Sequence, residues 1–239
     1  MIRYFPNTFF AKCFIIFGLL VGALLPVHAS PTFETSRQWV ELHFSGKLFD
    51  ENQHYLFQVH HRFRDTYSTL DEFLGRIGFL YDISERVSVG LGYDINPLDV
   101  STIKKYATIQ NLWQQIVLKV VKNRPYLVSA RTRLEERITG NQLGTGLRFR
   151  QYIGLVLPKI IYHKIAPVIN NEVFLNLNYP SWNSQRRFNQ NRVFVGLQCK
   201  LMDNVRLRAG YMNLFEKKAT VNEIDHIALV IITINQDIL

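Results

Sequence analysis

Arginine and glutamate alternate with apolar residues in the segment 126–157, YLVSARTRLEERITGNQLGTGLRFRQYIGLVL. The charged positions at two-residue spacing are Arg131, Arg133, Glu135 and Arg137 in the first half and Arg148 and Arg150 in the second half. Side chains two positions apart on a strand point to the same face, so the spacing predicts a β-hairpin with one charged and one apolar face. Guanidinium and carboxylate groups on one face can form bidentate pairs, and guanidinium groups can also bind anions.

The same alternation places further charged residues on the matching side of later segments. Together they define a predicted charge network of Arg131, Arg133, Glu135, Arg137, Arg148, Arg150, Glu172, Arg192, Arg206 and Arg208. Burying an unpaired charge is costly, so one interpretation is a set of salt bridges that fills an interior. Because arginines outnumber carboxylates in this set, the other interpretation is a narrow, anion-favouring pore, since charged rings tune pore selectivity.

Histidines offer the main alternative chemistry. A lipid hydrolase would need a nucleophilic serine close to a histidine, yet His60, His163 and His226 have no serine two residues away, and no G-x-S-x-G motif occurs. His43, His60 and His226 could converge as a metal site, but no close ligand spacing supports one. We therefore expect a protein that is not an enzyme, with no catalytic residues, no metal site and no cofactor.

The first 29 residues have the features of a cleaved secretory signal peptide. Arg3 and Lys12 make the start positive, residues 14–25 form an apolar run, and Ala29 supplies a small residue before the cleavage site. The apolar run is shorter than the ~20 residues that a spanning helix needs. We expect a signal peptide over 1–29 and a single β-barrel domain over 30–239. Cleavage would leave Cys199 as the one cysteine, which excludes an intramolecular disulfide.

The elements that carry these residues are all predicted to be strands, because apolar and polar residues alternate and no helical period extends over ten residues. Besides the two arms of the 126–157 hairpin, the segments are 39–44, 55–63, 73–83, 87–95, 107–121, 165–177, 189–201, 205–211 and 224–235. Bacterial barrels use even strand numbers. We therefore predict an all-β fold, an antiparallel up-and-down transmembrane β-barrel of about 10–12 strands.

The predicted connections alternate in length. Short turns are expected at 84–86, 122–125 and 202–204, and longer polar connections at 96–106, 139–144, 178–188 and 215–223. This alternation is typical of outer-membrane barrels, whereas a Greek-key sandwich has no reason to show it. In such a barrel the apolar face contacts lipid and the charged face lines the interior.

The formal net charge is +9, and it becomes +7 once Arg3 and Lys12 leave with the signal peptide. Export and the even spread of basic residues exclude nucleic acid as a partner. Two alternatives to the barrel with a charged interior stay open. One is a surface protein whose external loops bind lipopolysaccharide, with Trp182, Arg186 and Arg187 as candidate contacts to phosphates. The other is a soluble periplasmic lipid-binding barrel with its apolar face turned inward.

Several short motifs occur in a suggestive order: RTRLEER at 131–137, NEVFLNLN at 171–178, FNQNR at 188–192, GYMN at 210–213 and DHI at 225–227. In order and spacing they resemble an uncharacterised family of outer-membrane β-barrels, domain of unknown function 2490. The resemblance covers most of the mature chain and implies the fold and the outer membrane, but no activity. We therefore expect contact with outer-membrane lipid and lipopolysaccharide, and with the barrel-insertion machinery during assembly.

Overall fold

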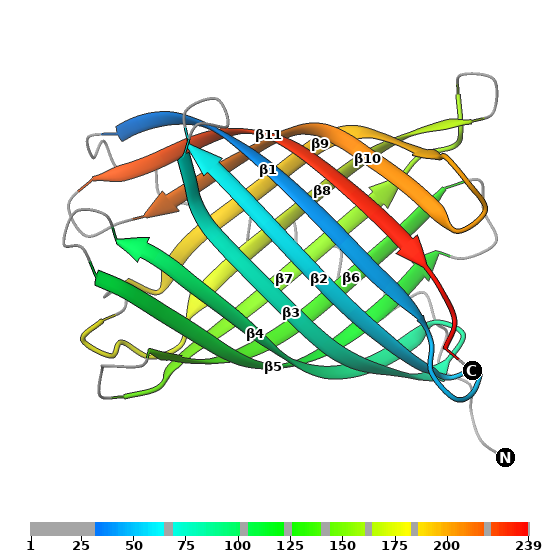
Figure 1. The fold of residues 1–239 in the computed structure, drawn as a ribbon, viewed down its shortest axis with the longest axis horizontal. Coiled ribbons are helices and arrows are strands. Elements are labelled where there is room, and N and C mark those ends of the chain that lie inside the picture. The colour runs from blue at the N-terminus through cyan, green and yellow to red at the C-terminus, as the bar shows by residue number, and fades with distance from the viewer. Residues whose placement is uncertain are drawn as a thin grey trace, which may run out of the picture. The chain divides into compact units, whose positions relative to one another are not determined.

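The computed structural model describes residues 32–64, 69–100, 105–121, 126–139, 144–160, 164–182, 186–217 and 221–238. Within these residues the strands are β1 (Thr32–Lys47), β2 (Gln53–Arg64), β3 (Thr69–Ser84), β4 (Val87–Val100), β5 (Lys105–Val121), β6 (Leu127–Thr139), β7 (Gly146–Val156), β8 (Ile165–Asn176), β9 (Phe188–Lys200), β10 (Val205–Lys217) and β11 (Asn222–Asn235). They form one closed barrel, which confirms the all-β prediction (Figure 1). The expected signal peptide lies outside the described residues, and these contain no helix that could cross a bilayer.

Consecutive strands pair antiparallel around the barrel, and the ring closes between β1 and β11. The described residues supply eleven strands, within the predicted range of 10–12 but not an even number. In an up-and-down barrel with an odd count, the first and last strands run in the same direction. The closing pair must then be parallel, and β1 and β11 do pair in parallel, from Thr32 opposite Asn222 to Ser45 opposite Asn235 (Figure 1).

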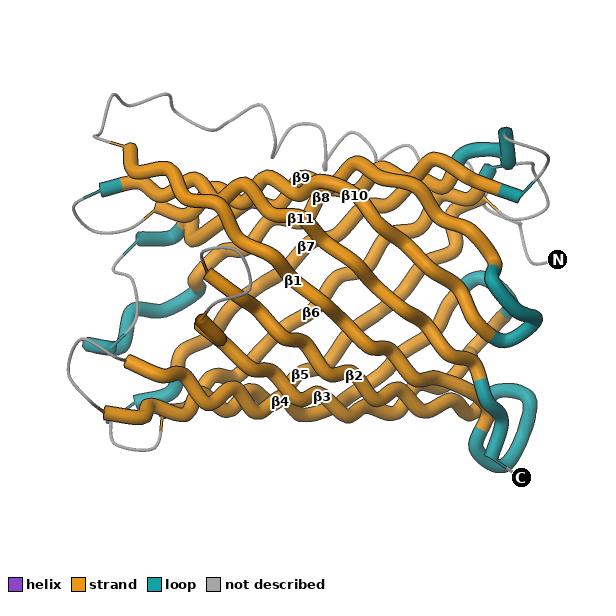
Figure 2. Tube along the Cα trace, turned by 45° about the horizontal axis from the view of Figure 1, so that its top comes forward, coloured by secondary structure: helices purple, strands orange, loops and turns teal. Residues whose placement is uncertain are grey.

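The strands cross the barrel wall obliquely. Starting from Lys47 near the end of β1, successive backbone partners lead through β2 to β11 and return to β1 at Phe33, near its beginning. This large offset means that the strands are strongly tilted, as closure of a sheet into a barrel requires. Figure 2 shows the slanted strands on the near and far walls.

The contrast between short and long connections is weaker than the sequence suggests. β4 continues to Val100, which pairs with Lys105, and β10 continues to Lys217, which pairs with Asn222. The predicted long connections at 96–106 and 215–223 are therefore wrong in extent, because backbone pairing continues through their polar ends. The segment 177–187, between β8 and β9, remains long as predicted.

Apolar side chains cover the outside of the barrel. Large outward residues from most strands are exposed, including Ile77 (60%), Leu91 (59%) and Val195 (52%). Alternate positions on the same strands, such as Arg76 and Asp94, are buried inside. The alternative in which the apolar face lines the interior is therefore wrong, since large apolar side chains of these strands are exposed and the charged side chains between them are buried.

Part of the barrel interior is apolar. Apolar side chains from β1 and β8 to β11 form one buried cluster of Trp39, Val168, Phe194, Met212, Leu214, Ile227 and Leu229. On β3 and β4, Gly78 faces Gly92 across the ladder, and Gly92 in turn faces Trp113 of β5. A Cβ atom at Gly78 would lie 2.5 Å from the Trp113 ring, so these glycines make room for a tryptophan that is completely buried.

We expect Gly92→Ala to destabilise the barrel by about 1–3 kcal/mol, the usual cost of overpacking. The new methyl group would overlap both the Trp113 ring and the carbonyl oxygen of Ile77. The measurement is the free energy of unfolding of the refolded protein in detergent micelles. Gly75→Ala is the matched control, because a Cβ there meets Ile95 at an ordinary 3.4 Å. Equal stability of the two variants would contradict this account of the glycines.

Candidate functional site

The charged interior surrounds a cavity of about 770 Å³. Of the ten residues that the sequence predicts for the charge network, those that line the cavity are Arg131, Arg137, Arg148, Arg150, Glu172, Arg192 and Arg208. Arg133 and Glu135 are buried beside them, with 1% and 0% of their surfaces exposed. The structure therefore brings nine of the ten predicted residues together.

Arg206 is the predicted network residue that the structure leaves apart. It is exposed near the turn between β9 and β10, in a smaller hollow lined also by Lys159, Lys164 and Lys200. In that turn Lys200 donates a hydrogen bond of 2.6 Å to Asp203, and this bond lowers the pKa of the Asp203 carboxyl. Alternation predicts which face Arg206 occupies, but its position at the strand end puts it at the barrel rim.

Glu135 on β6 is the most buried acceptor of the network. Arg148 donates to its Oε2 from Nε at 2.7 Å and from Nη2 at 2.5 Å, and Arg150 donates to Oε1 at 2.5 Å. Arg133 lies 3.8 Å from the same carboxylate and donates to the side-chain oxygen of Gln115 at 2.7 and 3.0 Å. β6 and β7 pair with Glu135 opposite Arg148, so the hairpin register itself brings these groups together.

Glu172 on β8 extends the network across the next strand. Its Oε1 accepts hydrogen bonds from Arg131 at 2.8 Å and from Arg150 at 2.8 and 2.9 Å. Arg150 therefore bridges two buried carboxylates, Glu135 and Glu172. Such bidentate and bridging geometry is what offsets the cost of removing charges from water.

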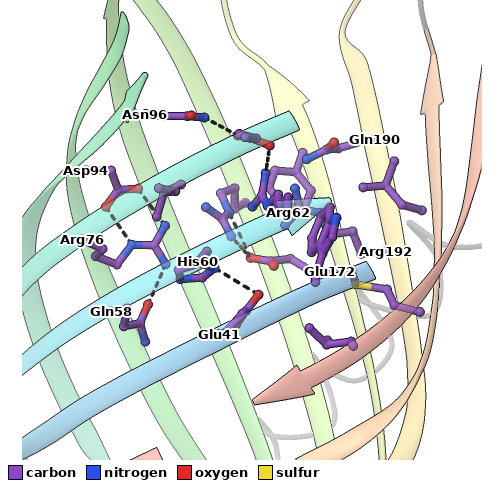
Figure 3. Close-up of a pocket in the computed structure, with 18 of the residues that line it drawn as sticks. Glu41, Gln58, His60, Arg62, Arg76, Asp94, Asn96, Glu172, Gln190 and Arg192 are labelled. Atoms are coloured by element: carbon purple, nitrogen blue, oxygen red, sulfur yellow. Dashed lines mark hydrogen bonds and ion pairs between the residues drawn. The ribbon is translucent and has the colours of Figure 1, made fainter. Parts of the chain in front are cut away.

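Two further ion pairs on β2 to β4 are absent from the sequence-based prediction. Arg76 and Asp94 form a bidentate pair at 2.7 and 2.7 Å (Figure 3). Trp113 donates to the same carboxylate at 2.6 Å. Arg62 pairs with Glu72, which also accepts a hydrogen bond from Asn96. These residues obey the same two-residue alternation, so the signal that identified the 126–157 hairpin could have found them.

Three lining arginines have no carboxylate within ion-pair distance among the described residues. Arg137 lies over the Trp182 ring at 5.5 Å, and Arg192 lies over Phe174 at 4.7 Å and Trp39 at 5.2 Å. Arg208 donates to Gln198 at 2.8 Å. The Nε–H group of each is buried without a hydrogen-bond partner in this part of the chain. An aromatic ring does not satisfy all the N–H donors of a guanidinium group, so these arginines can bind an anion.

The three histidines considered for a metal site lie in two places. Glu41, His43 and His60 lie together in the lumen, whereas His226 contacts Tyr211 at 2.7 Å and Glu34 at 3.5 Å elsewhere. The described residues that line the cavity include no serine, threonine or cysteine. A serine, threonine or cysteine nucleophile is therefore not part of this described lining, and the prediction of a protein that is not an enzyme stays a prediction.

The fold and the lumen define a closed β-barrel with an apolar exterior and an arginine-rich interior. The chain belongs to the family described as "Protein of unknown function (DUF2490)", whose model matches residues 36–225. The sequence resemblance is thereby confirmed. The chain is also 25% identical to an uncharacterized protein of Methylorubrum extorquens over 231 residues, which cover 95% of this chain and 96% of that protein. Among solved structures it is similar to LpxR from Salmonella typhimurium, with a TM-score of 0.46 and 7% identity over 76% of this chain and 83% of that one.

We expect Glu135→Gln to lower the free energy of unfolding by about 3–5 kcal/mol, the typical cost of breaking a buried ion pair. The neutral amide leaves Arg148 and Arg150 without a counter-charge at one of their acceptors. Urea unfolding in micelles, followed by tryptophan fluorescence, measures this. Glu51→Gln serves as the control, because Glu51 is exposed and its pair with Lys47 lies at the surface. If the two variants unfold alike, the buried network does not stabilise the barrel.

Proposed function

We propose that this protein is an integral outer-membrane β-barrel whose lumen binds and passes small anions. The membrane part of the proposal rests on the outward apolar surface. Residues such as Ile77, Leu91 and Val195 are more than half exposed on the outside of the closed barrel. Soluble proteins rarely expose apolar surface on this scale, whereas membrane barrels present such a band to lipid.

The anion part rests on one observation, the arginines without carboxylate partners. Among the described residues, the cavity lining holds nine arginines and six carboxylates. Most of the arginines are neutralised within the network, but Arg137, Arg192 and Arg208 retain buried N–H groups that point to no protein acceptor in the described chain. A purely structural network would pair its charges fully, because each uncompensated guanidinium costs stability.

The segment 177–187 at the β8–β9 end would restrict the size of what could pass. Trp182, from the long 177–187 segment, donates to the carbonyl oxygen of Gly144 at 3.0 Å and lines the cavity next to Arg137. Asn178 likewise donates to the carbonyl oxygen of Thr145 at 2.8 Å. The segment is therefore tied across to the β6–β7 connection, and the proposed permeant ion is small.

The surface-binding alternative receives less support. Trp182, its main aromatic contact, is engaged with Gly144 and Arg137 and is not free for display. Arg186 and Arg187 are exposed and would lie near lipopolysaccharide phosphates in an outer membrane. We keep that contact as part of the surroundings of the barrel and not as its activity.

Membrane integration predicts the fractionation behaviour. We expect the protein in the outer-membrane fraction, extractable only by detergent and retained after osmotic shock, because the apolar exterior needs lipid or detergent around it. Sucrose-gradient fractionation and immunodetection provide the measurement. Release into the periplasmic fraction by osmotic shock would contradict membrane integration and leave the lumen without a transport role.

Anion passage predicts the reversal potential in planar bilayers. Under a KCl gradient we expect the refolded barrel to favour chloride over potassium. The double variant Arg137→Gln/Arg192→Gln should shift the reversal potential toward zero, because charged side chains set pore selectivity. Arg86→Gln removes a positive charge in the β3–β4 turn, away from the lumen lining, and should leave selectivity unchanged. A silent wild-type barrel, or a double variant with wild-type selectivity, would refute the proposed pathway.

A further inference from the structure

A cluster of one carboxylate and two imidazoles lies in the lumen, apart from the unpaired arginines. Glu41 and His43 are two residues apart on β1 and therefore share its inner face. His60 stands opposite Glu41 in the β1–β2 register. Neighbouring strands thus deliver three metal-ligating side chains to one point of the cavity wall.

The three side chains are close enough to share one ion. His43 Nε2 lies 2.9 Å from Glu41 Oε2, and His60 Nδ1 lies 3.0 Å from Glu41 Oε1. The three candidate ligand atoms lie within 4.8 Å of one another. Zinc holds nitrogen and oxygen ligands at about 2.0–2.2 Å, so any two ligand atoms end no more than about 4 Å apart. Small side-chain rotations are enough to close that difference.

The burial and hydrogen bonding of His60 point independently to a missing ligand. Its side chain is buried, with 6% of the residue exposed, and its Nε2 atom has no hydrogen-bond partner in the described chain. Nδ1 lies 3.0 Å from Oε1 of Glu41, an ion-pair contact drawn in Figure 3, whereas the buried Nε2 has no hydrogen-bond partner among the described residues. Buried polar groups in native proteins are nearly always satisfied, so a group or ion is expected beside this ring.

The nearby positive charges do not exclude a cation. Arg76, which faces this region from β3, is neutralised by Asp94 and also donates to Gln58 at 3.1 Å. Arg62, next along β2, is neutralised by Glu72. The Glu41 carboxylate has no guanidinium within ion-pair distance among the described residues, so its charge is available to an ion.

We propose that Glu41, His43 and His60 form a binding site for a divalent transition-metal ion, with zinc as its representative. Two imidazoles and a carboxylate suit such an ion, whereas calcium and magnesium prefer oxygen ligands alone. Three protein ligands would leave one tetrahedral position open, and all three residues line the cavity. The site therefore joins the lumen as a place where a water molecule or an anion completes the coordination.

The test is zinc titration of the purified, refolded barrel without a polyhistidine tag, by calorimetry in detergent. We expect one zinc ion per chain, and a cobalt(II) complex with the visible absorption of a low-coordinate site. Zinc should also raise the midpoint of heat unfolding, because an ion that binds only the folded state stabilises it. Loss of an outer-shell partner already weakens metal binding 10–100-fold, so His60→Ala is expected to weaken it by about 100-fold or more.

Matched variants separate a site from surface binding. His226→Ala removes a histidine that lies away from the cluster and should bind zinc like the wild type. His43→Ala changes a partly exposed side chain, so it supplies the decisive comparison if His60→Ala does not fold. Absence of stoichiometric binding, or binding retained in the His43→Ala variant at wild-type affinity, would overturn the proposal. Both readouts are independent of conductance, so the site stands or falls separately from the proposed anion pathway.

Discussion

The carboxylate of Glu135 lies completely buried between arginines of β6 and β7. Ion pairs of this kind, between a buried carboxylate and guanidinium groups, hold the charged part of the interior together. An apolar exterior leaves the inward positions as the place for polar side chains, and a ring of eleven strands encloses more space than small side chains fill. Arginine meets both demands because its side chain is long and its planar head pairs in a bidentate manner. Each guanidinium then requires a carboxylate, amide or aromatic face within reach. The pairing of Arg76 with Asp94, and of Arg150 with two glutamates, follows from that requirement.

Arg192 lies between the apolar cluster and the charged network. Its guanidinium lies over Trp39, which belongs to the apolar cluster, and over Phe174, which lies beside the charged network. The apolar cluster and the charged network are thus in contact inside the barrel. An ion inside this barrel would meet Arg137 on β6 and Arg208 on β10, and Glu41 with the two histidines on β1 and β2 would offer it a different kind of ligand. Selectivity and metal binding would then be properties of the same surface, set by neighbouring strands.

Much of this arrangement follows from the sequence. The two-residue period fixes which face each residue takes, so the barrel, its eleven segments and nine of the ten network residues follow from the pattern alone. The partners of each arginine do not, because they depend on register across strands: Arg76 meets Asp94 only because β3 and β4 pair in that alignment. The cluster at Glu41 depends on register too, since His60 is distant in sequence from Glu41 and His43. Arg206 shows the opposite limit, because its face is predictable but its height along the barrel is not.

The parallel seam between β1 and β11 has a consequence for how the chain folds. Every other pair of strands can form locally from a connecting turn, whereas this pair joins the two ends of the barrel and closes the longest loop in the chain. Loop-closure entropy slows the formation of such a contact, so we expect the β1–β11 pair to form last. Until then β1 and β11 carry open backbone edges of the kind that recruit strands from other chains. After closure, Arg37 fastens the seam to Glu223 and Asp225 at 2.9 and 3.0 Å. The barrel is therefore most prone to aggregation before β1 and β11 pair. A chaperone that covers one of these two strand edges would protect the chain during that interval.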